Sequence, residues 1–218
     1  MDTFDLYKDM QCRTNGEIYL GVVGPVRSGK STFIKRFMDV LVLPKMTDEH
    51  AKERTVDELP QSASGKSIMT TEPKFVPKEA AKIQLAKDVS VRVRLIDCVG
   101  YMVDGASGHL ENGEERLVKT PWNEKEIPFT KAAEIGTKKV IHDHSTIGIV
   151  VTTDGSIGEL LRESYRAAEK KTIQELKSIG KPFVVLVNTR KPYSTEAKNV
   201  AEEIRREYQV TALPVNCE

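Results

Sequence analysis

Short apolar runs alternate with stretches of helical periodicity along most of the chain. Strands are predicted at about 17–23, 90–96, 146–152, 183–188 and 209–215. Strands that alternate with helices are typical of a parallel sheet with helices packed on both faces. The pattern therefore predicts an α/β fold with a mostly parallel sheet.

Two helices are predicted most clearly, at about 158–179 and 194–207. Gly180 and Pro182 follow the last periodic position of the first helix and end it. Its predicted apolar face consists of Leu161, Tyr165, Ala168, Leu176 and Ile179. The charged residues of the second helix most simply form its solvated face.

Three other segments lack such a clear pattern. Segment 72–86 is predicted to add one or two edge strands, which pair antiparallel through a turn at Pro77 and Lys78. Neither 43–70, which is polar, nor 101–130, with its scattered glycines and prolines, is predicted to form regular elements. Long irregular segments in a compact domain are usually functional or mobile. Both lie where switch-type nucleotide hydrolases have their nucleotide-sensing loops.

The segment after the first strand has the pattern of a phosphate-binding loop. It reads GPVRSGKS, which matches G-x-x-x-x-G-K-[ST], and an amphipathic run at 32–38 follows it. A strand before this pattern and a helix after it favour a functional loop over a chance glycine-rich turn. The residues predicted to bind the nucleotide here are Gly24, Pro25, Val26, Arg27, Ser28, Gly29, Lys30, Ser31 and Thr32.

Each part of this loop has a predicted task. The glycines let the backbone direct its N–H groups at phosphate oxygens, and the helix N-terminus adds partial positive charge. Lys30 is predicted to reach the β- and γ-phosphates, and the Ser31 hydroxyl is predicted to bind Mg²⁺. The chain is therefore predicted to bind a nucleoside triphosphate.

The strand at 90–96 leads into Asp97-Cys98-Val99-Gly100, the pattern D-x-x-G. At the carboxyl end of a strand, Asp97 is predicted to lie beside the phosphate loop and to hold Mg²⁺ through a water. The N–H of Gly100 is predicted to meet the γ-phosphate. The alternative is an aspartate that only caps a turn.

Thr70 and Thr71 lie between these motifs and are the candidates for the threonine that senses hydrolysis. The hydroxyl of such a threonine completes the Mg²⁺ shell, and loss of the γ-phosphate releases its loop. The sequence does not choose between the two, and both could instead simply open the strand that follows. Hydrolysis is thus predicted to depend on Lys30, on Asp97 and on this pair.

Tyr101 follows D-x-x-G, where small switch GTPases carry a glutamine that orients the attacking water. A phenol cannot replace that amide geometrically, so intrinsic hydrolysis is predicted to be slow. The water must then be positioned by another group, such as a threonine, a backbone carbonyl or a neighbouring subunit.

The strand at 183–188 runs into Asn188-Thr189-Arg190-Lys191, where guanine-specific members of this class carry N-K-x-D. The aspartate of that motif accepts hydrogen bonds from guanine, whereas Lys191 has three donors and no acceptor. Each pair lost at a buried base costs about 1–3 kcal/mol, so ATP is the predicted nucleotide. Asn188 and Arg190 are predicted to bind it. Arg190 either stacks on the base or is only an exposed loop residue.

Length and composition favour one intracellular domain that covers 1–218. With 33 basic and 32 acidic residues, nothing indicates nucleic-acid or membrane binding. Three scattered cysteines indicate a reducing compartment, and the sequence has no apparent secretory signal or membrane-spanning run. His142 and His144 more simply belong to a polar turn than to a metal site. Cys98 is predicted to be a small buried residue rather than a redox thiol.

Further segments carry a more specific resemblance. They are DELPQSA at 57–63, IMTTEPKFVP at 68–77, DCVGY at 97–101, AEIGT at 133–137 and HSTIG at 144–148. Together with the phosphate loop, they resemble the family of stage IV sporulation protein A, the spore-coat morphogenetic ATPase of endospore-forming bacteria. The resemblance spans essentially the whole chain, and its middle segments are not general features of phosphate-loop proteins.

This resemblance implies a phosphate-loop fold of the translation-factor GTPase (TRAFAC) type that uses ATP and Mg²⁺. It implies that ATP hydrolysis drives a conformational change and self-assembly into the basement layer of the spore coat. That layer surrounds the developing spore on the mother-cell side, in the cytoplasm. By position, Lys30 and Ser31 are the phosphate and Mg²⁺ residues, Asp97 is the metal-side carboxylate, and Thr70 or Thr71 is the hydrolysis sensor.

Members of that family continue well past the length of this chain. Their further domains are implicated in polymerisation and in docking to the spore membrane through a small amphipathic peptide. The resemblance therefore implies that this chain is the ATPase part of a longer protein. Partners, namely that peptide and other coat proteins, would then bind mainly through segments beyond it.

Two other functions stay open from the residues alone. One is a GTP-dependent switch that recruits a partner. The other is a metabolic kinase, which usually needs a lid with arginines, whereas segment 101–130 contains only Arg116.

Overall fold

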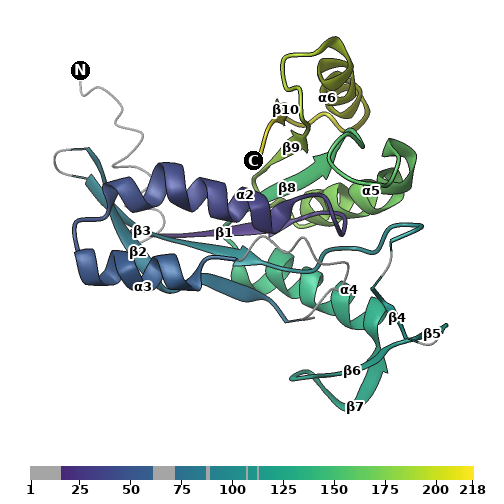
Figure 1. Cartoon of the computed structure of the whole chain (residues 1–218), viewed down its shortest axis with the longest axis horizontal. Helices are drawn as coiled ribbons and strands as arrows, with labels where there is room; N and C mark the ends of the chain where they lie inside the picture. Colours follow the sequence, from purple (N-terminus) through teal and green to yellow (C-terminus); the bar gives the residue numbers. More distant parts are fainter. Residues whose placement is uncertain (1–15, 61–71, 87–88, 107, 112) are drawn as a thin grey trace.

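The central element of the protein is a sheet, seen in a computed structural model that describes residues 16–60, 72–86, 89–106, 108–111 and 113–218 (Figure 1). Within these residues the sheet has six strands in the order β10-β9-β8-β1-β3-β2. They are β1 (Glu17–Val23), β2 (Lys74–Ala86), β3 (Val89–Asp97), β8 (Ile147–Thr153), β9 (Phe183–Asn188) and β10 (Ala212–Val215). Every neighbouring pair is parallel except β2 with β3. The predicted α/β class with a mostly parallel sheet is confirmed.

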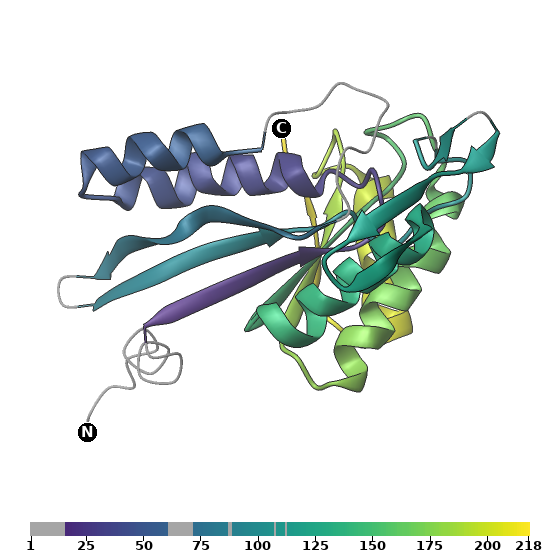
Figure 2. The same ribbon diagram turned by 90° about the horizontal axis from the view of Figure 1, so that it is seen from below.

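Helices cover both faces of this sheet, as predicted (Figure 2). One face carries α2 (Lys30–Phe37) and α3 (Glu49–Glu58), joined by the helical turns η1 (Met38–Val42) and η2 (Leu43–Lys45). The other carries α4 (Phe129–Lys139) with its continuation η3 (Val140–His144), α5 (Arg162–Ser178) and α6 (Thr195–Tyr208). In the described part of the chain, no helix is both long and apolar enough to span a bilayer.

The alternation of side chains along β3 explains why the core has two layers. Val93 and Leu95 are buried on the side of α2, where they belong to one cluster with Ile34 and Met38. Ile96 comes next along the strand and belongs to the cluster of the opposite layer, together with Ile141 of η3. Successive strand residues face opposite sides of the sheet. Where both faces of a strand are buried, almost all of its residues must therefore be apolar.

The edge strand β2 is confirmed, but its predicted turn at Pro77 and Lys78 is wrong. Residues 74–86 form one strand that pairs antiparallel with β3, with a shift in register between Val76 and Ala81. The Val76–Pro77 peptide bond within this strand is cis. Proline cannot donate to the ladder, so it is tolerated on an edge strand at an irregularity of this kind.

Helix α5 is shorter than predicted, because it begins at Arg162 rather than near residue 158. The three central positions of its predicted apolar face are buried: Tyr165, Ala168 and Leu176. The outer two are not, since Leu161 is 75% and Ile179 is 38% exposed. Leu161 precedes the first turn in an extended conformation and Ile179 caps the last turn, so neither belongs to the helical face.

Helix α6 matches its prediction, and the strand after it is shorter than predicted. Gln209 ends the helix in the left-handed conformation, with φ 54°. Strand β10 therefore begins at Ala212 instead of residue 209.

The prediction that segment 43–70 is irregular is wrong over its first part, where η2 and α3 lie. Asp48 caps α3 by accepting a hydrogen bond from the Ala51 N–H at 3.0 Å. Thr55 is the one buried residue of this helix. With so few apolar positions, hydrophobic periodicity does not reveal it. Residues 61–70 lie outside the described residues.

Segment 101–130 also contains regular structure, against the prediction. Strand β4 (Leu110–Glu111) pairs with β5 (Glu114–Glu115), and β6 (Leu117–Thr120) pairs with β7 (Asn123–Pro128). Figure 1 shows these two hairpins projecting from the body of the protein near α4. The backbone of Arg116 connects the hairpins to the start of α4. Its N–H donates to His109 O at 2.9 Å, and its carbonyl accepts from the Phe129 N–H at 2.8 Å.

Candidate nucleotide-binding site

Strand β1 delivers the phosphate-loop motif to the carboxyl edge of the sheet. It lies between β3 and β8, which the chain reaches on opposite sides of it. At such a point the connections diverge to either side, and open α/β sheets bind their ligands there. Residues 24–29 form the loop, and α2 begins directly after it at Lys30.

The backbone of the loop requires its two glycines. Gly24 has φ 135°, and a Cβ there would lie 2.3 Å from the carbonyl oxygen of Val151. Gly29 has φ 92°, and a Cβ there would lie 2.2 Å from Nδ2 of Asn188. Residues other than glycine rarely adopt these φ values. Arg27 between them has φ 60° although it is not glycine, and its side chain is exposed.

Lys30 places a buried ammonium group inside this loop. The residue is 5% exposed, and its Nζ donates to the carbonyl oxygen of Pro25 at 2.6 Å. It forms no ion pair with any carboxylate of the described residues. Burial lowers the pKa of Lys30, while the charges of Cys98 and Asp97 oppose that shift. A buried cation without an ion-pair partner is suited to a phosphate group.

The hydroxyl of Ser31 and the carboxylate of Asp97 meet beside Lys30. Ser31 Oγ donates to Asp97 Oδ2 at 2.7 Å. The other oxygen, Oδ1, is buried and has no hydrogen-bond partner among the described residues. Burial raises the pKa of Asp97, and the bond from Ser31 and the charge of Lys30 oppose it. Hydroxyl and carboxylate oxygens are ligands that Mg²⁺ prefers, so the residues present fit this ion.

The D-x-x-G turn lies against the phosphate loop, which is where the sequence predicts it. Gly100 has φ 95°, and a Cβ there would lie 2.1 Å from Gly24 O and 2.6 Å from Lys30 Nζ. Tyr101 N–H donates to Gly24 O at 3.2 Å, and Val26 N–H donates to Tyr101 O at 2.8 Å. The Val26 amide is therefore bonded to protein and is not directed at a phosphate in this arrangement.

The remaining residues of the loop are placed in the same region. Ser28 is fully buried, and its hydroxyl has no partner among the described residues. Thr32 lies half-buried in the first turn of α2. Thr70 and Thr71, the predicted sensor pair, lie outside the described residues.

Asn188 bridges two segments with one amide group. Its Nδ2 donates to Ser28 O at 3.1 Å, and its Oδ1 accepts from Cys217 N–H at 3.2 Å. It is 3% exposed. The predicted contact of Asn188 with the nucleotide stays a prediction, and the contacts in the structure connect it to the phosphate loop and to the turn after β10.

The rest of the base-reading motif forms a loop braced from one side. Thr189 is buried, and its Oγ1 accepts from Lys191 N–H at 3.2 Å. Ser156 Oγ lies 3.3 Å from Thr189 Oγ1 and accepts from Arg190 N–H at 3.1 Å. The side chains of Arg190 and Lys191 are exposed. The backbone of this loop is thus fixed while its two cations are free to reach a ligand.

Sequence reasoning missed the contribution of the loop between β8 and α5. Asp154 Oδ1 accepts hydrogen bonds from the N–H and the Oγ of Ser156, at 2.9 and 2.6 Å. This local turn presents Ser156 to the base-reading loop. The triplet Asp154-Gly155-Ser156 after an apolar strand was the available signal, because such residues typically form turns of this kind.

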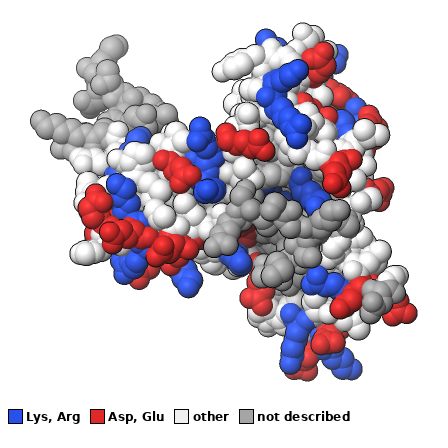
Figure 3. All heavy atoms as spheres, in the orientation of Figure 1, with Lys and Arg blue, Asp and Glu red and all other residues white. Residues whose placement is uncertain are grey.

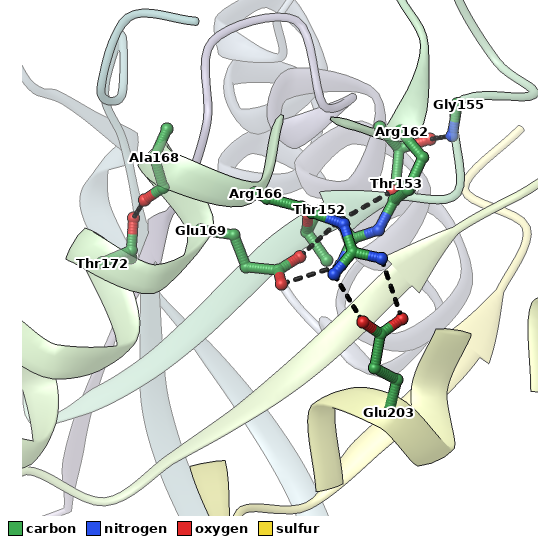
Figure 4. Close-up of polar contacts among 9 residues, drawn as sticks. All are labelled: Thr152, Thr153, Gly155, Arg162, Arg166, Ala168, Glu169, Thr172 and Glu203. Carbon is green, nitrogen blue, oxygen red and sulfur yellow. Dashed lines mark hydrogen bonds and ion pairs between the residues drawn. The ribbon is translucent and has the colours of Figure 1, made fainter. Parts of the chain in front are cut away.

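A buried ion pair anchors the end of that loop (Figure 4). Arg162 donates from Nη1 to Glu169 Oε2 at 2.6 Å and from Nη2 to Glu169 Oε1 at 2.8 Å. The same Nη1 lies 3.3 Å from Thr152 Oγ1 and 3.3 Å from Thr153 O, at the end of β8. The pair therefore fixes where α5 begins relative to the carboxyl edge of the sheet.

Two minor candidates are also placed. Cys98 is buried, and burial raises the pKa of its thiol to about 11. His142 lies in η3 rather than in a turn, and its Nε2 is 2.7 Å from Glu175 Oε1. Figure 3 shows basic and acidic side chains interspersed over the face in view.

Comparison with known proteins gives a consistent result. The family model described as "Stage IV sporulation protein A, ATPase domain" matches residues 1–218. Stage IV sporulation protein A of Clostridioides difficile (strain 630) is 56% identical over 212 residues, which is 97% of this chain and 43% of that protein. The protein of the same name from Bacillus subtilis (strain 168) is 50% identical over 218 residues, 100% of this chain and 44% of that protein.

Similarity to solved structures is weaker. A variant of SsGBP is 13% identical with a TM-score of 0.48, covering 99% of this chain and 58% of that one. Translation elongation factor SelB from Methanococcus maripaludis is 13% identical with a TM-score of 0.47, covering 92% of this chain and 29% of that one. The chain spans less than half the length of the curated relatives given above.

Proposed function

This chain belongs to the stage IV sporulation protein A family, to its ATPase domain, and on that premise we propose that it binds ATP with Mg²⁺ and hydrolyses ATP slowly. The observation that carries the proposal is the meeting of three side chains at one edge of the sheet. Lys30 supplies a buried cation, and Ser31 donates to Asp97, whose second oxygen has no partner in the part of the chain that the structure describes.

Each residue has a task in this mechanism. Lys30 binds the β- and γ-phosphates and neutralises charge on the transferred group. Ser31 and Asp97 would hold Mg²⁺, which when bound would neutralise phosphate charge and orient the oxygens. The N–H of Gly100 donates to the γ-phosphate. Because Tyr101 is buried and its hydroxyl contacts no polar partner within the described ranges, we propose that it does not orient the water and that hydrolysis is slow.

Thr70 or Thr71 completes the proposal as the residue that senses the γ-phosphate. We expect the double change Thr70→Ala with Thr71→Ala to reduce phosphate release far more than ATP binding. Equal phosphate release by this variant and by the unchanged protein would remove the pair from the mechanism.

Adenine is the proposed base, because Lys191 offers donors where guanine needs an acceptor. Arg190 extends from the same loop and is proposed to stack on the base. Competition binding with labelled ATP against unlabelled GTP tests the choice. If GTP binds about tenfold more tightly, the protein is instead a GTP-dependent switch.

Beyond hydrolysis, the proposed role is self-assembly in the spore coat. ATP hydrolysis drives a conformational change that leads to the basement layer around the developing spore, in the mother-cell cytoplasm. The support is membership of a family named for a sporulation protein. A small amphipathic membrane peptide and other coat proteins are proposed partners, mainly through segments that the longer relatives possess.

The decisive experiment is Lys30→Ala, with Lys35→Ala as a matched control from the exposed side of the same helix. Removing the buried ammonium is expected to abolish binding of ATP, measured by calorimetry with Mg²⁺. The control should bind as the unchanged protein does.

The alternative of a metabolic kinase has its own test. Phosphate that appears on an added metabolite instead of in solution would indicate a kinase.

A further inference from the structure

The ring of Tyr101 is held on several sides by elements that lie far apart in the sequence. It is 3% exposed and belongs to a small cluster with Val26 of the phosphate loop and Tyr165 of α5. The ammonium of Lys171, also from α5, lies 4.6 Å from the ring centroid. Glu134 of α4 pairs with Lys171 at 3.0 Å and so keeps it in place.

The hydroxyl of this tyrosine plays no part in that anchoring. It is buried and has no hydrogen-bond partner among the described residues. Burial raises its pKa, so the phenol is neutral. It therefore forms no hydrogen bond with Lys30, Ser31 or Asp97, and the ring alone carries the packing.

The backbone of Tyr101 makes the connection to the phosphate loop. Its N–H donates to Gly24 O and its carbonyl accepts from the Val26 N–H, so that Pro25 and Tyr101 form an isolated parallel bridge between the two loops. The preceding residue, Gly100, lies close to Lys30 Nζ, because a Cβ at residue 100 would lie 2.6 Å from that nitrogen. Moving the Tyr101 ring would therefore move Gly100 relative to Lys30.

We propose that Tyr101 is a positioning residue for ATP hydrolysis: its ring, clamped between Val26, α5 and the Lys171–Glu134 pair, holds the Gly100 N–H at the γ-phosphate in fixed geometry with Lys30. The residue touches no reacting atom and acts through Gly100. Through the same clamp, a shift of the D-x-x-G turn is passed to α4 and α5. This inference rests on the proposed function.

The test compares three variants: Tyr101→Phe, Tyr101→Leu and Tyr193→Leu. Phenylalanine keeps the ring and removes only the hydroxyl. Leucine keeps an apolar side chain but loses the ring face under Lys171. Tyr193 is 88% exposed and serves as a control for the loss of a tyrosine. For each protein, kcat and KM for ATP, the Kd of ADP and the melting temperature are measured.

The ADP measurement separates positioning from a general loss of structure. ADP has no γ-phosphate and uses the loop but not the Gly100 contact. We expect Tyr101→Leu to lower kcat about tenfold or more, with the Kd of ADP changed less than about threefold. Tyr101→Phe and Tyr193→Leu should stay within about twofold of the unchanged protein in both quantities.

Three results would overturn the proposal. They are an unchanged kcat in Tyr101→Leu, a loss of ADP affinity equal to the loss in kcat/KM, or a Tyr101→Phe variant as impaired as the leucine variant. Should Tyr101→Leu not fold, Lys171→Met takes its place, with the same expected fall in kcat at unchanged ADP affinity. An unchanged protein that releases no phosphate would instead refute the proposed function itself.

Discussion

Ser31 and Asp97 are separated by 66 positions in the sequence, yet Ser31 Oγ lies 2.7 Å from Asp97 Oδ2. This contact joins the first turn of α2 to the end of β3. It brings together two oxygen-bearing side chains, and the second oxygen of the carboxylate is buried without a partner from any residue that the structure describes. Each side chain is within reach of an ion bound by the other.

Asp97→Asn keeps the shape of the side chain and removes its charge. We expect the apparent affinity for Mg²⁺ in the hydrolysis reaction to fall about 10–100-fold, with a smaller effect on binding of ATP itself. Titration of Mg²⁺ against phosphate release measures this. Asp104→Asn, at an exposed position of the following segment, is the matched control. Identical Mg²⁺ curves for the two variants would contradict the metal assignment.

Gly100→Ala introduces a methyl group where there is no space. The Cβ would lie 2.1 Å from Gly24 O, and the backbone has φ 95°. We expect a loss of about 1–3 kcal/mol in the free energy of unfolding, together with reduced hydrolysis. Gly113→Ala separates the two causes, since Gly113 has φ 85° but no atom within 4 Å of its Cβ position. Equal destabilisation in urea unfolding would mean that backbone strain, and not the contact, is responsible.

Asn188→Ala leaves two buried backbone groups, Ser28 O and Cys217 N–H, without partners. Each such group costs about 1–3 kcal/mol in the free energy of unfolding. Nucleotide affinity should fall as well, because the phosphate loop loses a brace. The control is Asn199→Ala on the exposed side of α6, expected to change stability by about 0.5 kcal/mol or less. Thermal unfolding with and without ATP measures both effects. Equal changes in stability for the two variants would show that Asn188 does not stabilise the phosphate loop.

Arg162→Met removes one partner of the buried ion pair in Figure 4 and leaves Glu169, 2% exposed, without its partner. Breaking a buried pair from one side costs about 3–5 kcal/mol. Arg166, from the same helix as Arg162, forms an exposed pair with Glu203 of α6. Arg166→Met should therefore cost about 1 kcal/mol or less. The comparison by chemical denaturation decides whether burial sets the difference.

The thiol of Cys217 is expected to be inert in the folded protein. Burial raises its pKa to about 12, so at pH 8 the thiolate is a fraction of roughly one in ten thousand. Alkylation at this cysteine, followed by peptide mass spectrometry, should be negligible at pH 8 and increase as the pH approaches the pKa. Rapid labelling at pH 8 in the folded state would show that the site is open to solvent.

Much of the fold follows from the sequence because the buried strands are almost purely apolar. β1, β8 and β9 have neighbours on both edges and are buried over most of their length, so most of their positions require apolar side chains. The polar elements were not predictable in this way. Helix α3 and the hairpins β4–β5 and β6–β7 bury few side chains, and they are held by a cap and by backbone bonds through Arg116.

The candidate site also has a part that the sequence predicts and a part that it does not. Fixed motifs placed Lys30, Ser31, Asp97 and Gly100 at one edge of the sheet, because the carboxyl ends of parallel strands meet there. The bracing of that edge could not be predicted, since Asn188 reaches Cys217 and Ser156 reaches Thr189 only after the chain has folded. Contacts between loops depend on the final geometry and leave no periodic signal.

The planar carboxamide of Asn188 donates a hydrogen bond to the phosphate loop and accepts one from the backbone of Cys217. A carboxamide carries both functions on one flat group without a change of protonation state. A Cβ on the neighbouring Gly29 would lie 2.2 Å from the amide nitrogen, so any side chain at residue 29 would displace this group. Residues 29 and 188 therefore constrain each other, although 159 positions separate them in the sequence.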